Sequence, residues 1–101
     1  ITVQRADLTR SLIERMVEAD AVNAVISIDR SRERLTASNE EVRLARLMVD
    51  AEQRKFVAGE STLLQLNLRE RFLAEALLRQ VSARADWARA RLMLRWATGT
   101  I

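Results

Sequence analysis

The sequence predicts an all-α fold, a long antiparallel coiled-coil helical hairpin, and three observations support this fold class. The 101 residues include no proline and only two glycines, so very little interrupts a helix. Apolar residues make up 49% of the chain and charged residues 31%, and Ala, Leu, Val and Arg dominate, as in long helices and coiled coils. Apolar and small residues also recur every seven positions on both sides of Gly59, which is the spacing of a coiled-coil seam.

The first helix is expected from about residue 2 to residue 56. Its large apolar residues form a heptad-spaced row at Ile28, Leu35, Val42, Val49 and Phe56. A second row consists of the small residues Ala24, Ser31, Ser38 and Ala45. Small residues in a seam allow a partner helix to come close. At 1.5 Å per residue this helix is about 80 Å long.

A tight turn is predicted at about residues 57–61. Gly59 can adopt a positive φ without strain, so it is the expected residue at which the first helix ends. Thr62 and Gln65 have the spacing of a capping box at the start of a second helix, and Ser61 is an alternative N-cap. A stop signal followed directly by a start signal indicates a helical hairpin.

The second helix is expected from about residue 62 to residue 97, with Gly99 as its stop, and it has two apolar stripes. The first stripe matches the seam of the first helix and contains Leu66, Leu73, Gln80, Trp87 and Leu94, with Ala76, Ala83, Ala90 and Ala97. The second contains Leu64, Leu68, Leu78, Val81, Ala85, Leu92 and Trp96. A helix with two apolar faces has two neighbours, which indicates an oligomer or a larger parent chain. Residues 1–19 of the first helix extend beyond any partner within the chain, since a fold at Gly59 brings Gly99 opposite roughly Asp20.

Several functional classes are disfavoured by the residue types present. Without His or Cys the chain lacks the most frequent general base and the usual zinc ligands, and we expect no enzyme, no cofactor and no metal site. The carboxylate pairs Glu40–Glu41 and Asp50/Glu52 are interpreted as surface charges. Trp87 is expected in the core, whereas Trp96 fits either a seam or an exposed end. An arginine cluster would suit RNA or acidic lipid, and it contains Arg84, Arg89, Arg91 and Arg95. Asp86 interrupts the cluster, however, and we expect no aromatic stacking platform beside it. A solvated face and no nucleic-acid partner are therefore expected.

One ordered set of residues resembles a known family. The stretch "AEQRKFVAGESTLLQLNLRERFLAEALLRQVSARADWARARLMLRWATG" resembles the last part of the repeat unit of TolC-type outer-membrane efflux proteins. The resemblance rests on an aromatic residue, a small-Gly pair, a Ser-Thr pair, a Leu-rich segment, an Ala-spaced helix and a terminal small-Gly stop. These features are Phe56, Ala58-Gly59, Ser61-Thr62, Leu63 to Leu68, the row Ala76, Ala83 and Ala90 with Trp87, and Thr98-Gly99.

The resemblance implies a function for the hairpin. Proteins of this family are trimers whose helical barrel crosses the periplasm below a β-barrel in the outer membrane, and they export small molecules or polypeptides. This chain is then expected to be a fragment, a periplasmic hairpin whose turn docks a periplasmic adaptor protein. Contact with the membrane would be made only by segments outside these residues. The docking residues implied are Val57, Ala58, Gly59, Glu60, Ser61, Thr62 and Leu63.

A second interpretation remains open, because coiled coils in general share the Ala and Leu spacing. The chain would then be a coiled-coil scaffold or adaptor hairpin that mediates protein–protein association, with partners that the sequence does not identify.

Overall fold

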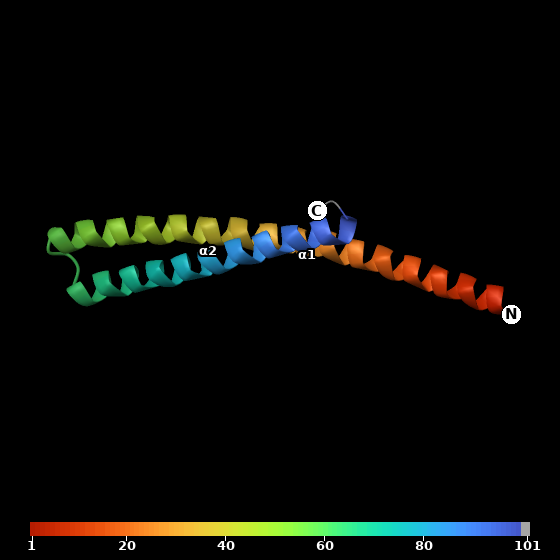
Figure 1. Ribbon diagram of the computed structural model, residues 1–101. Coiled ribbons are helices and arrows are strands. Elements are labelled where there is room, and N and C mark those ends of the chain that lie inside the picture. The colour runs from red at the N-terminus through yellow and green to blue at the C-terminus, as the bar shows by residue number, and fades with distance from the viewer. Residues whose placement is uncertain (100–101) are drawn as a thin grey trace.

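Two antiparallel helices joined by one turn form the whole fold in the computed structural model, which describes residues 1–99 (Figure 1). Helix α1 extends over Thr2–Val57 and helix α2 over Leu63–Thr98. The molecule measures 85 × 21 × 13 Å, and no strand occurs within residues 1–99. The predicted all-α hairpin is therefore confirmed.

The helix boundaries differ from the predicted ones by a single residue. Val57 completes α1 instead of beginning the turn, and Thr62 precedes α2 as its N-cap. An N-cap residue has non-helical backbone angles, and Thr62 has φ −108° and ψ 156°. Thr98 extends α2 by one residue before Gly99, whose φ of 68° ends the helix as expected.

The seam between α1 and α2 follows the predicted rows, and its most buried members are small. Ser31 is 2% exposed and Ala76 is 1% exposed, whereas the large seam residues Leu35 and Leu73 are only half-buried. This contrast shows that the two backbones approach closely at the small residues. The buried positions within residues 1–99 are Ser31, Ser38, Val42 and Glu52 on α1, and Leu66, Ala76, Ala83 and Ala90 on α2.

Phe56 departs from the prediction that it belongs to the seam, because 40% of it is exposed. Heptad spacing places its ring on the correct face of α1. The seam ends here, however, since α1 stops one residue later at Val57. A side chain at the end of a seam is covered from one side only.

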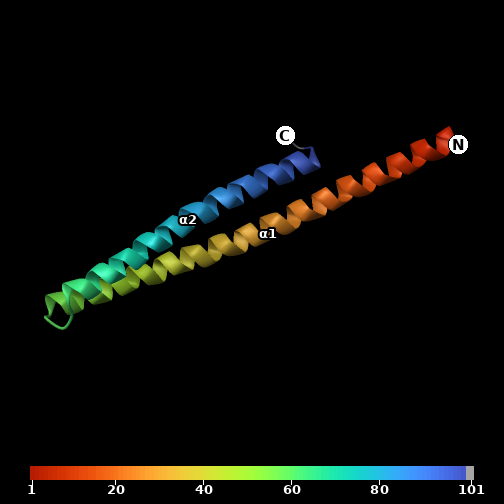
Figure 2. The ribbon, with the colours of Figure 1, turned by 90° about the horizontal axis from the view of Figure 1, so that it is seen from below.

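The N-terminal part of α1 projects beyond the end of α2, as both views show (Figures 1 and 2). Every residue from 1 to 20 is exposed. Asp20 lines the same groove as Trp96 and Ala97, so the C-terminal end of α2 lies level with Asp20 as predicted. Neither described helix combines the length and the apolar character needed to cross a membrane.

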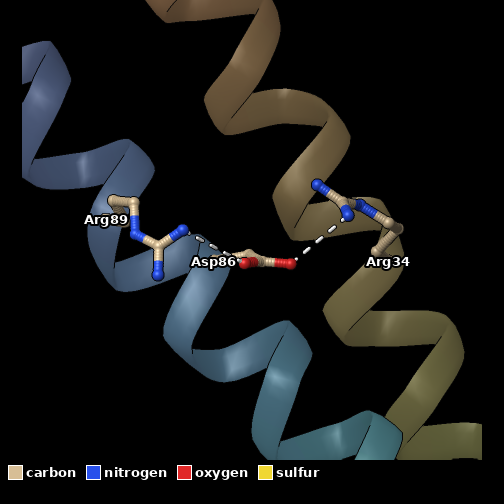
Figure 3. A network of polar contacts seen from close by, with 3 residues as sticks. All are labelled: Arg34, Asp86 and Arg89. Carbon is tan, nitrogen blue, oxygen red and sulfur yellow. Dashed lines mark hydrogen bonds and ion pairs between the residues drawn. The ribbon is translucent and has the colours of Figure 1, made fainter.

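Polar contacts also join the two helices across the seam. Asp86 on α2 lies 3.4 Å from Arg34 on α1 and 3.9 Å from Arg89 on its own helix (Figure 3). The amide of Gln80, a polar residue within the predicted seam, donates a hydrogen bond of 2.8 Å to Asn39. Exposed ion pairs contribute about 0–1 kcal/mol each, so these contacts are consistent with the register but add little to the stability of the hairpin.

Candidate partner-docking site

The turn at the end of the hairpin is a built structure with defined backbone hydrogen bonds. Gly59 has φ 78°, and its amide donates to the carbonyl of Phe56 at 3.0 Å. The amide of Glu60 donates to the carbonyl of Lys55 at 2.8 Å. This pair of bonds around a left-handed residue is the Schellman arrangement that closes a helix C-terminus. The predicted role of Gly59 in ending α1 is thereby confirmed.

The start of α2 makes half of the predicted capping box. The Thr62 hydroxyl accepts a hydrogen bond from the amide of Gln65 at 3.2 Å, so Thr62 and not Ser61 is the N-cap. In a complete capping box the Gln65 side chain would accept from the amide of Thr62. It is instead placed 3.3 Å from the hydroxyl of Ser61. Ser61 is therefore part of a side-chain cluster and does not cap α2.

All seven residues that the sequence assigned to docking lie together at this end of the rod. We call residues 57–63 the tip. Val57 is 81% exposed and Leu63 is 58% exposed, and only Ser61 is partly covered. A Cβ atom built on Gly59 would meet no atom within 4 Å. The tip thus offers bare backbone flanked by two apolar side chains, and its role in docking stays a prediction.

Glu52 corrects the prediction that the pair Asp50/Glu52 is a surface feature. Asp50 is exposed, but Glu52 is 6% exposed and lies on the seam face of α1. Its carboxylate accepts a hydrogen bond of 2.5 Å from the hydroxyl of Ser61 in the turn. The signal was present in the sequence, because Glu52 continues the small-residue row at the next heptad position after Ala45.

The other carboxylate pair is engaged with arginines. Glu40 accepts two hydrogen bonds from Arg43, which hold the pKa of Glu40 below its ordinary value. Glu41 accepts from Arg79 on α2, and this hydrogen bond raises the pKa of Arg79. Both acids are therefore charged partners of arginines on an exposed surface. Within residues 1–99, no three metal-ligating side chains lie close enough together to hold a metal ion.

The arginine cluster of α2 is divided among different contacts. Arg89 lies beside Asp86, and the guanidinium carbon of Arg91 is 4.7 Å from the centre of the Trp87 ring. Trp87 is half-buried as part of the seam, with its indole nitrogen buried and without a hydrogen-bond partner. Trp96 is 74% exposed, which settles the alternative that the sequence left open for it.

The second apolar stripe of α2 is uncovered in this chain. Its large members are between 44% and 78% exposed. All of them fall outside the seam positions, and Trp96 alone among them also borders the groove beside Asp20 of α1. A stripe of this length on a two-helix rod is unusual for a free surface.

Comparisons with known proteins add no assignment. No protein-family model, no curated protein and no solved structure matches this chain.

Proposed function

We propose that this hairpin is the periplasmic tip segment of a TolC-type export channel and that its turn docks a periplasmic adaptor protein. The observation that carries the proposal is the exposed turn around Gly59, in which bare backbone lies at the extreme end of a long rigid rod. A surface without side chains allows another helical hairpin to approach closely. Exposed turns carried on a rigid scaffold are common binding sites.

The outer face of α2 supports a place in a wall of helices. Six exposed apolar residues lie along this face, and their spacing alternates between four and three positions. They are Ala74, Leu78, Val81, Ala85, Ala88 and Leu92. This spacing is that of a second coiled-coil seam. A helix flanked by two neighbours is what a wall of side-by-side helices requires, with α1 as one neighbour and a further helix as the other.

The outer face of α1 has a different character at the same height along the rod. The cross-seam pairs Arg34–Asp86 and Asn39–Gln80 place residues 29–43 of α1 level with the apolar stretch of α2. The exposed outer positions of α1 in this stretch are Asp29, Glu33, Thr36, Glu40 and Arg43. If α1 of one copy packed against the outer face of α2 of another copy at this height, these charges would be buried against leucine and valine, at a high cost in free energy. The neighbour of α2 is therefore expected to be a helix other than this α1.

Crosslinking tests the docking role directly. The chain has no cysteine, so a photo-crosslinker can be attached at a single site, with Glu60→Cys at the tip and Arg30→Cys on the shaft as the matched control. Both positions are exposed. The probes are purified helical hairpins of periplasmic adaptor proteins. We expect adducts from the tip site alone. Adducts from neither site, or equally from both, would contradict the proposal.

Substitutions of Gly59 then separate turn formation from docking. Asn tolerates the left-handed conformation, so Gly59→Asn is expected to keep the turn while placing a side chain on the docking surface. Gly59→Val is expected to strain the turn as well. We expect Gly59→Asn to abolish adduct formation while the circular dichroism of the hairpin stays the same. If Gly59→Asn left the adduct yield unchanged, Gly59 would be a turn residue only.

The scaffold interpretation remains the second candidate, and one observation favours it. The seam, the turn and the cross-seam ion pairs are all those of a coiled-coil hairpin of any function. On this interpretation the outer face of α2 is the binding surface, and the tip is merely a connection. Adduct formation from outer-face sites of α2 such as Ala85→Cys, without any from the tip, would support the scaffold.

A further inference from the structure

Glu52 interrupts the pattern of the seam at the layer closest to the tip. The heptad row to which it belongs otherwise contains only small residues, namely Ala24, Ser31, Ser38 and Ala45. Glu52 is nevertheless 6% exposed, and it is the only buried charged residue within residues 1–99. A buried carboxylate is costly unless hydrogen bonds compensate it. Its presence in a seam of alanines therefore calls for a specific partner.

The partner of Glu52 belongs to the turn. The hydroxyl of Ser61 lies 2.5 Å from one oxygen of the Glu52 carboxylate and 3.3 Å from the side-chain oxygen of Gln65. A hydroxyl has one hydrogen to donate, and the shorter contact to a charged acceptor is the stronger. Ser61 stands between the two backbone caps, after the Gly59 turn and before the N-cap Thr62. The contact thus ties the middle of the turn to the shaft of α1.

Arg69 on α2 is a second charged residue at the level of Glu52. It continues the row of Ala76, Ala83 and Ala90 towards the tip, and it is half-buried. Where the other layers of this row are small, the layer at the tip thus has a glutamate on one helix and an arginine on the other. No ion pair joins the two side chains, so the hydrogen bond from the turn stays the direct contact of the buried carboxylate.

We infer that Glu52 is a positioning residue for the tip. Its carboxylate holds Ser61, and through Ser61 it fixes the exposed backbone at Gly59 and Glu60 in one arrangement relative to the shaft. The contact between Glu52 and Ser61 is called the tip latch below. That the latch pre-organises the tip for a partner rests on the proposed function, whereas its effect on the turn itself does not.

Hydrogen exchange of individual amides tests the latch in the intact chain. The amides of Gly59 and Glu60 report on the turn, because both are hydrogen-bonded within it. In Glu52→Leu and in Ser61→Ala we expect these amides to exchange about tenfold faster or more. The amides of residues 35–49 should keep or increase their protection in Glu52→Leu, since an apolar side chain suits the seam. A residue that merely stabilised the hairpin would change both groups of amides in the same direction.

Two further variants serve as controls. Glu52→Gln retains an oxygen that accepts from Ser61, so it should restore slow exchange at Gly59 and Glu60. Asp50→Leu removes an exposed carboxylate two residues away and should leave the turn amides unchanged. If Glu52→Leu failed to fold, Ser61→Ala would still report on the latch, because it leaves the seam intact. Turn amides that exchange within about twofold of the unchanged chain in both Glu52→Leu and Ser61→Ala would overturn the inference.

The crosslinking assay distinguishes this inference from the proposed function. If both hold, the Glu60→Cys adduct forms, weakens on adding Glu52→Leu and returns with Glu52→Gln. Faster exchange in Glu52→Leu without any adduct in the starting chain would keep the latch and refute adaptor docking. An adduct that forms equally in all three backgrounds, with exchange unchanged, would keep docking and refute the latch.

Discussion

Gly59 offers the cleanest test of how the chain makes its turn, because its positive φ is the only feature of the fold that disfavours a larger residue at this position. Its φ is 78°, a region that residues other than glycine rarely adopt. A Cβ at this position would meet nothing within 4 Å, so Gly59→Ala introduces no clash. The whole effect of the substitution on the folded state is therefore the strain of a left-handed backbone.

The expected size of the effect follows from two opposing terms. A left-handed conformation costs an L-residue about 1–2 kcal/mol. Replacing glycine by alanine also removes freedom from the unfolded chain, which stabilises the fold by about 0.4–1 kcal/mol. The net loss for Gly59→Ala is roughly 1 kcal/mol, or about fivefold in the folding equilibrium. Gly59→Val should lose more, because a β-branched residue fits this region still less well.

Gly99 supplies the matched control, since its φ of 68° and its empty surroundings resemble those of Gly59. Gly59 must stay left-handed for the hairpin to close, whereas the last turn of α2 can fray instead of accepting strain. Urea unfolding followed by circular dichroism, at one protein concentration, should therefore show a clear loss for Gly59→Ala and a smaller one for Gly99→Ala. Equal losses, or none for Gly59→Ala, would refute the reasoning.

Three further predictions concern the seam, the outer face and pH. Ala83→Leu should destabilise the hairpin by about 1–3 kcal/mol through overpacking, whereas the exposed Ala51→Leu should change the urea midpoint little. The isolated chain should self-associate through its exposed apolar surface, and Leu78→Glu should weaken this in sedimentation equilibrium; a stable monomer at high concentration would contradict it. The hydrogen bonds from Arg43 lower the pKa of Glu40, so the stabilisation they give is present at neutral pH and is lost as acid protonates Glu40. Because the pair is exposed, this stabilisation is small. The urea midpoint of Glu40→Gln should therefore be only slightly lower than that of the unchanged chain at neutral pH, and the two midpoints should coincide in acid.

Heptad spacing was sufficient to predict the seam because it depends only on the local geometry of each helix. Heptad spacing also predicts that Glu52 is buried, because it lies seven residues after Ala45. The charge of its carboxylate instead led to the prediction of a surface position. Phe56 shows the opposite failure, since spacing gave its face correctly but said nothing about where the partner helix ends. Both misses lie within two helical turns of the tip, where the regular seam meets the irregular chain.

The details of the tip could not be predicted for a different reason. The capping-box spacing favoured Thr62, with Ser61 as the alternative, and the structure confirms Thr62 as the N-cap. What Ser61 contacts instead could not be predicted, because it depends on the path of the chain after Gly59. That path places the hydroxyl of Ser61 against Glu52, which removes it from competition for the cap. A contact between residues on opposite sides of a turn depends on the turn already being formed.

The unequal outer faces of the two helices bear most directly on which neighbours the hairpin can take. A hairpin that works alone in solvent has no reason to keep leucine and valine on the far side of one helix, and here Leu78 and Val81 are 71% and 62% exposed. At the same height α1 presents Asp29, Glu33 and Glu40. Only α2 therefore needs a second helical neighbour at this height, and that neighbour must be apolar where α1 is charged. In the proposed channel, a wall assembled from non-identical hairpins meets this requirement, and in the scaffold interpretation an apolar partner helix on α2 does. A ring in which α1 of one copy meets α2 of the next at the same height does not.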